Sequence, residues 1–200
     1  MIQGKNKEEI SKKRIEKLVR QLLIEVGENP NREGLVDTPT HVAEIYKEIF
    51  AGYRMNSGLY CRHVTFSENT DTIVAKDIQF YSMCEHHMLP FYGKIQIAYI
   101  PSSISFDNTK LTYVVEKYAR RLQIQERLTR QIADEIIGMG VKGVSVIVEA
   151  KHLCMKMRGV RNDSSIMTEC NRGIMEQKQF REHAHSLIYT PAEPKLRSVL

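Results

Sequence analysis

The first part of the chain carries apolar residues at the spacing of amphipathic helices. Within residues 10–26 they recur every three or four positions, as on one face of a helix, and Gly27 ends the pattern as a C-terminal cap. A second helix is predicted to begin at Asp37, because Pro39 falls in its first turn, and to end near Gly52. The chain therefore opens with two helices joined by a polar turn.

Between residues 63 and 100 the pattern changes to a period of two. Three segments rich in β-branched and aromatic residues predict strands: "HVTFSE", "DTIVAKDIQF" and "KIQIAYI". Helical spacing returns over residues 111–137, which we predict to form one long helix closed by Gly138 and Gly140. Residues 143–157, "GVSVIVEAKHLCMKM", alternate strongly and predict a further strand. The pattern after this strand favours neither helix nor strand.

The order of helices, strands, one long helix and strands predicts an α+β fold. Its sheet is mainly antiparallel and is covered on one face by helices. We divide the chain into an N-terminal helical region, residues 1–60, a main α+β domain, residues 61–190, and a C-terminal tail, residues 191–200. The tail contains two prolines and has no helical or strand pattern.

Composition and charge narrow the class of protein. Apolar residues make up 42% of the 200-residue chain, which is enough for a sizeable core. The net charge of +5 favours anionic partners such as phosphates but is too small to predict a nucleic-acid partner. The N-terminus lacks the apolar centre of a signal peptide, and no run of about 18 apolar residues predicts a membrane span. We therefore expect a cytoplasmic protein without membrane contact.

The chain has four cysteines, too few for a disulfide framework in a protein of this size: Cys61, Cys84, Cys154 and Cys170. In a reducing compartment such residues serve as metal ligands, nucleophiles or small core residues.

Two short segments concentrate side chains that bind metals or transfer protons. In "CEHHMLPF", Cys84 and His87 are spaced to share one ion, and His86 lies between them. In "EAKHLCMKM", His152 and Cys154 are two apart on the predicted strand and so point to the same face. Leu153 and Met155 would then face the core. Cysteine and imidazole together are the ligand set that zinc prefers.

The spacing leaves the number of zinc ligands open. Three protein ligands, Cys84, His87 and Cys154, would leave a position for water, as in catalytic sites, with His86 and His152 beside the ion. His152 or Cys170 would equally complete a four-ligand structural site.

Four segments together resemble one enzyme family. "REGLVDTP", "CEHHMLPF", "RRLQIQERLT" and "GVSVIVEAKHLCMKMRG" are similar, in order and spacing, to GTP cyclohydrolase I, and the match spans residues 31–173. The resemblance implies a T-fold: a four-stranded antiparallel sheet with two helices on one face, preceded by N-terminal helices. It also implies a homo-oligomer, usually a decamer of two pentamers, with active sites between subunits.

The resemblance implies a zinc-dependent reaction on GTP. Cys84, His87 and Cys154 would bind Zn²⁺, and the fourth position would carry the attacking water, whose pKa zinc lowers toward about 7. Water attacks C8 of guanine, His152 acts as general acid at N7, and His86 assists the proton transfer. The ring opens, formate leaves and 7,8-dihydroneopterin triphosphate forms, as the first step of pterin and folate biosynthesis.

The resemblance also implies the substrate-binding residues. Gln125 and Glu126 would recognise guanine, where a carboxylate accepts both N1–H and the exocyclic amine. Without the resemblance, the simplest interpretation of Glu126 is an exposed charge on a helix, paired with Arg130 one turn later. Contacts to the triphosphate and ribose are implied for three further residues: Thr109, Lys110 and Arg158.

The chain departs from the family pattern near the predicted phosphate contacts. In "DNTKLTY", Asp107 stands where the family has glycine and Tyr113 where it has arginine, and His41 replaces a further common arginine. Three interpretations follow: weaker GTP binding, replacement cations such as Arg120 or Arg161, or a guanine nucleotide with a different phosphate tail. A fourth hypothesis, from another class, is a non-catalytic purine- or pterin-binding paralogue with structural zinc.

Overall fold

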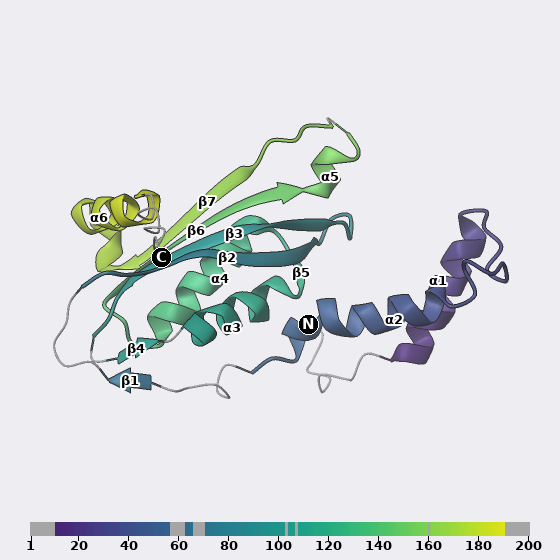
Figure 1. Ribbon diagram of the computed structural model, residues 1–200, viewed down its shortest axis with the longest axis horizontal. Coiled ribbons are helices and arrows are strands. Elements are labelled where there is room, and N and C mark those ends of the chain that lie inside the picture. The colour runs from purple at the N-terminus through teal and green to yellow at the C-terminus, as the bar shows by residue number, and fades with distance from the viewer. Residues whose placement is uncertain are drawn as a thin grey trace, which may run out of the picture.

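The computed structural model describes residues 11–56, 63–65, 71–102, 104–106, 108–159 and 161–190 (Figure 1). Cys61, Asp107 and the predicted tail lie outside these ranges. No helix within them is both long enough and apolar enough to span a membrane. The division of the chain at residues 60 and 190 stays a prediction.

The two predicted N-terminal helices are confirmed as α1 (Lys12–Glu25) and α2 (Thr38–Ile49), followed by the 3-10 turn η1 (Ala51–Tyr53). Ser11 caps α1, because its hydroxyl accepts a hydrogen bond from the backbone N–H of Arg14 at 3.4 Å. α1 packs against α2, and the pair extends away from the sheet (Figure 1).

A five-stranded sheet forms the centre of the molecule, with strand order β5-β2-β3-β6-β7. Four long strands are antiparallel neighbours: β2 (Ile73–Cys84), β3 (Pro90–Ile100), β6 (Gly143–His152) and β7 (Ile166–Gly173). They confirm the predicted four-stranded antiparallel sheet. The fifth strand, β5 (Leu122–Gln123), adds a short parallel edge beside the end of β2.

The remaining elements surround this sheet. They are β1 (His63–Thr65), β4 (Ile104–Phe106), α3 (Asn108–Ala119), α4 (Gln125–Gly138), α5 (Leu153–Lys156), η2 (Ile174–Glu176) and α6 (Lys178–Tyr189). The strands β1 and β4 pair with each other. In Figure 1, α3 and α4 lie on one face of the sheet and α6 lies on the other.

The core has two parts because helices cover both faces. The larger part lies between the sheet and α3 and α4, and includes Phe80 and Ile132. The smaller part joins Ile147 to Ile188 of α6. Residues 143–148 of β6 are consequently all buried, although their sequence alternates. Helices were predicted on one face of the sheet, and α6 covers the other face as well.

The single helix predicted over residues 111–137 is wrong, because α3 and α4 are separate helices. Between them the chain runs as β5 beside the last two residues of β2. The buried amide of Gln123 donates a hydrogen bond to the backbone oxygen of Tyr118 at 3.0 Å, which satisfies a carbonyl at the end of α3. This pairing joins segments far apart in the sequence, so local periodicity does not reveal it.

The strand predicted over residues 143–157 ends at His152. Its neighbour β3 begins at Pro90, which has no backbone N–H to donate, so the ladder stops there. The chain turns instead into the single helical turn α5. Leu153 and Met155, expected to face the core, are only half-buried.

Candidate active site

Three side chains of kinds that serve as metal ligands meet where β2 and β6 end. Cys84 is the last residue of β2, His87 lies in the turn that follows, and Cys154 lies in α5. Their ligand atoms all lie within 4.8 Å of one another, and Cys84 Sγ is 3.9 Å from His87 Nδ1. The turn is closed by a 2.8 Å hydrogen bond from the Met88 N–H to the Cys84 oxygen. Cys154 reaches this group from a helical turn, so the same-face strand argument was wrong.

The donor set fits a zinc ion. Tetrahedral zinc with bonds of about 2.0–2.3 Å needs donor separations of roughly 3.3–3.8 Å, slightly closer than this group. Burial, together with the neighbouring Cys84 thiol, raises the pKa of the Cys154 thiol. A bound divalent cation reverses that effect, because it stabilises the thiolate. Two sulfurs and one imidazole are donors that favour zinc over harder cations.

The two side chains considered as fourth ligands do not join the group. His152 makes a hydrogen bond through Nε2 to Gln125 Oε1 at 2.8 Å. Cys170 pairs with Val146, six residues before His152, which places it roughly 20 Å along the strand from the metal group. Among the described residues, therefore, three side chains offer ligand atoms to this position.

His152 is held on two sides. Its ring stacks in parallel on Phe91, with 4.7 Å between ring centroids, because these residues are paired in the β3–β6 ladder. Burial lowers the pKa of His152, and the charge of Glu126 opposes this effect. Glu126 is exposed in the first turn of α4 and makes no ion pair with Arg130, which the structure also describes.

The structure turns Gln125 inward. The residue is only 2% exposed, and its amide nitrogen lies within 3.1 Å of three acceptors: Val148 O, Ile166 O and Thr168 Oγ1. Gln125 and Glu126 are adjacent in the sequence, but in the protomer only Glu126 faces solvent.

His86 lies on the open side of the site. Its side chain is 65% exposed, and its Nε2 is 4.0 Å from Glu85 Oε1. Glu85 also pairs with Arg127 on α4, and this hydrogen bond lowers the pKa of Glu85 and keeps the carboxylate ionised.

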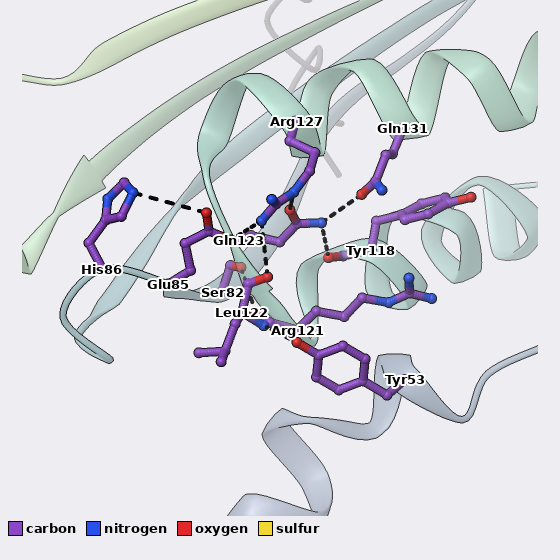
Figure 2. A network of polar contacts seen from close by, with 10 residues as sticks. All are labelled: Tyr53, Ser82, Glu85, His86, Tyr118, Arg121, Leu122, Gln123, Arg127 and Gln131. Carbon is purple, nitrogen blue, oxygen red and sulfur yellow. Dashed lines mark hydrogen bonds and ion pairs between the residues drawn. The ribbon is translucent and has the colours of Figure 1, made fainter. Parts of the chain in front are cut away.

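Figure 2 shows that Arg127 belongs to a larger polar network between the metal-binding turn and the helices. Arg127 Nε donates to Gln123 Oε1 at 2.8 Å, and Gln123 Nε2 donates to Gln131 Oε1 at 2.8 Å. The backbone N–H of Glu85 donates to the Gln123 oxygen at 3.0 Å. Sequence reasoning missed these braces. The only local signal is that Glu85 and Arg127 each adjoin a predicted site residue.

Arg121 extends the network to the N-terminal helices. Its guanidinium donates two hydrogen bonds to the Gly52 oxygen, at 3.1 and 2.7 Å, and lies over the rings of Tyr53 and Tyr118. The Tyr53 hydroxyl accepts the Leu122 N–H at 3.1 Å (Figure 2). The η1 turn is thereby fixed against β5.

Thr109 and Lys110 lie far from the metal donors of the same chain. They are in the first turn of α3, whose 12 residues span roughly 18 Å, and the other end of α3 leads to β5 beside Cys84. Phe106, just before α3, donates its N–H to the Tyr99 hydroxyl at 3.0 Å. Tyr99 is paired with the first residue of β2, whereas Cys84 is the last. Thr109 is exposed and Lys110 is only 3% exposed.

Arg158 follows α5 and is exposed at the same end as the metal donors. Of the two replacement cations, Arg120 is bound by the carboxylates of Glu116 and Glu48. Arg161 is exposed, and its backbone N–H donates to the Arg158 oxygen at 3.3 Å. No ion pair joins Arg161 to another described residue, so its charge is available beside Arg158.

Two of the three positions at which the chain departs from the family pattern are described by the structure, Tyr113 on α3 and His41 on α2. The Tyr113 hydroxyl donates to the Asn56 oxygen at 2.8 Å, which ties α3 to the segment after η1. His41 is exposed on α2.

Comparison with known proteins agrees with this geometry. The sequence profile of the family described as GTP cyclohydrolase I matches residues 15–189. A GTP cyclohydrolase 1 of Clostridium kluyveri is 46% identical over 178 residues, covering 88% of this chain and 96% of the relative. One of Hyperthermus butylicus is 46% identical over 181 residues, covering 90% and 92%.

A solved structure, an archaeosine synthase QueF-like protein in the apo form, is 15% identical, with a TM-score of 0.43 over 53% of this chain and 97% of that one. That likeness is too distant to carry an argument. The profile and the relatives each cover most of the chain, and on them we conclude that the protein belongs to the GTP cyclohydrolase I family.

Proposed function

We propose that the protein is a zinc-dependent GTP cyclohydrolase I. It would hydrolyse GTP at C8 of guanine, open the imidazole ring, release formate and yield 7,8-dihydroneopterin triphosphate. The observation that carries the proposal is the meeting of Cys84, His87 and Cys154 beside His152, at the end of the sheet where Glu126 is exposed. A cytoplasmic location and a place in folate or other pterin synthesis stay predictions.

Each side chain has a distinct task in the proposed reaction. Cys84, His87 and Cys154 would hold zinc, which supplies a Lewis acid that makes water nucleophilic near neutral pH. His152 would donate a proton to N7 of guanine, because an imidazole titrates close to neutrality. His86, exposed beside the metal donors, would exchange protons with solvent.

Substrate binding is shared between a carboxylate and cations. Glu126 would accept N1–H and the exocyclic amine of guanine, a pair of donors that adenine lacks. Glu126 directly follows Gln125, which bonds His152, and this supports a pose in which the base would lie against the proton donor. Arg158 would bind the phosphates, and the exposed Arg161 supports it.

The position of Thr109 and Lys110 supports a site built from more than one protomer. Because these residues lie near the start of β2 and the metal donors near its end, a neighbouring chain would have to supply them to the triphosphate. We propose a homo-oligomer, as the family resemblance implies, in the form of a decamer of two pentamers.

The alternatives have less support. A four-ligand structural zinc would need another donor, and the described residues bring three together. A nucleotide with a different phosphate tail or a non-catalytic paralogue is not favoured, because the similar relatives are named GTP cyclohydrolase 1.

The test is a turnover assay on the zinc-loaded oligomer with GTP, GDP and GMP under identical conditions. We expect formate and a dihydropterin chromophore in equal amounts, with a clear preference for GTP. A zinc-replete oligomer that releases neither product from GTP would overturn the proposal. Equal turnover of GDP or GMP would instead support the altered phosphate tail.

A further inference from the structure

The amide of Gln125 can adopt only one orientation in its buried site. Two of the atoms around its nitrogen are the backbone oxygens of Val148 and Ile166, at 3.0 and 2.9 Å. Carbonyl oxygens only accept hydrogen bonds, so they require the NH₂ group rather than the amide oxygen. Reversing the amide would place an oxygen against two others in a site that is only 2% exposed. The Gln125 oxygen must therefore face His152.

The orientation of Gln125 determines which nitrogen of His152 carries a proton. His152 Nε2 is 2.8 Å from Gln125 Oε1, and an amide oxygen can only accept. Nε2 must then carry a hydrogen, and in the neutral ring the lone pair is on Nδ1. The parallel stack on Phe91 holds the plane of the ring, so the imidazole is fixed on two sides.

The network behind Gln125 holds its amide in place. Thr168 Oγ1 is 3.1 Å from the amide nitrogen and 2.6 Å from Thr129 Oγ1. The Thr129 hydroxyl also bonds the backbone oxygen of Gln125 at 2.8 Å. These contacts join the start of α4 to β6 and β7. Because acceptors inside the protomer already take the amide hydrogens of Gln125, this side chain has no hydrogen left to donate to the guanine base of a substrate.

We propose that Gln125 is a positioning residue that fixes His152 in the Nε2–H tautomer, so that Nδ1 is the nitrogen that exchanges a proton with the substrate. This inference rests on the proposed function. It replaces the guanine contact expected for Gln125 and assigns recognition of the base edge to Glu126 alone. In the proton transfer, the imidazolium gives its Nδ1 proton to the purine nitrogen and returns to the neutral Nε2–H form.

The tautomer can be measured without turnover. Solid-state ¹⁵N spectra of the zinc-loaded, histidine-labelled protein report which ring nitrogen carries hydrogen, and His152→Asn protein assigns the signal. We expect a protonated Nε2 and an unprotonated Nδ1 in the neutral ring. A neutral His152 with its hydrogen on Nδ1 overturns the proposal, even if Gln125 variants do not fold.

Kinetics separate positioning from contact with the base. Gln125→Met removes the acceptor for Nε2, and we expect kcat to fall about 10- to 100-fold, as when a histidine loses its orienting partner, with KM for GTP little changed. Glu126→Gln should instead raise KM. The matched control is Gln179→Met, the same change at an exposed position of α6 on the other face of the sheet, where tautomer and kcat should be retained.

The outcomes distinguish the inference from the proposed function. If Gln125→Met keeps the Nε2–H tautomer and raises only KM, Gln125 contacts guanine and the inference is wrong. If the wild-type protein does not convert GTP but the tautomer shifts in Gln125→Met, the inference holds and the proposed function fails.

Discussion

The two ends of the central sheet carry different parts of the proposed site: one end carries the proposed metal ligands, and the other carries the proposed phosphate contacts. The metal end, with Cys84, His87, Cys154 and His152, is assembled within one protomer and held by hydrogen bonds. The phosphate end, at the start of α3 with Thr109 and Lys110, lies near the opposite end of β2.

The departures from the family pattern that the structure describes are Tyr113 on α3 and His41 on α2. The residues to which the family resemblance assigns metal binding and proton transfer are all present at the metal end, whereas Tyr113 lies in α3, which begins at the phosphate end. The chemistry needs atoms placed to within a fraction of an ångström, which a single folded core provides. Contacts to a charged tail act over longer distances and tolerate substitution better.

The largest expected effect is at the metal end. Cys154→Ala should abolish both zinc binding and GTP turnover, because two protein ligands cannot complete a zinc site. Metal analysis and formate release measure the two losses. The matched control is Cys170→Ala on β7, which should keep both, since Cys170 lies away from the metal group. Full zinc content in Cys154→Ala would contradict the assignment.

Mixed oligomers test whether the two ends meet across a boundary between chains. His152→Ala and Lys110→Met should each be nearly inactive alone. Assembled together in equal amounts, they should recover roughly a quarter of wild-type turnover, because sites that combine the intact ends occur at random. Mixing His152→Ala with Cys154→Ala should recover nothing, since both changes lie at the metal end. Absence of recovery in verified mixed oligomers would show that one chain supplies both ends.

Arg127 tests the brace behind the metal-binding turn. Arg127→Met removes the partner of Glu85 and one bond to Gln123, and we expect kcat to fall about tenfold with zinc retained. Arg130→Met, an exposed neighbour on α4, is the matched control and should behave as wild type. Wild-type kcat in Arg127→Met would limit this network to a structural role.

The smallest expected effect is at the phosphate end. Tyr113→Arg restores the cation of the family pattern and should lower KM for GTP by up to about fivefold, because partly exposed charge pairs contribute at most about 1 kcal/mol. Tyr113→Phe removes the hydroxyl that bonds Asn56 and adds no charge, so it should leave KM unchanged and lower the free energy of unfolding by about 1 kcal/mol. An unchanged KM in Tyr113→Arg would mean that other cations, such as Arg161, already serve the phosphates.

The amino-acid sequence by itself determined some of the elements and the kinds of ligand. Helical periodicity located α1 and α2, alternation located β2 and β3, and the cysteines and histidines clustered within residues 84–87 and 152–154 indicated a zinc-type donor set. These features are local: each depends on residues a few positions apart, or on side-chain chemistry that does not change with the fold.

Only the tertiary structure decided how those parts meet. The break between α3 and α4, the helical turn that carries Cys154, and the inward orientation of Gln125 all depend on pairing between distant segments. Gln125 and Glu126 are adjacent polar residues in the first turn of α4. Gln125 is buried because its amide bonds backbone carbonyls of β6 and β7, whereas Glu126 is exposed. Hydrogen-bond partners far away in the sequence are set by the register of the sheet, and periodicity carries no information about them.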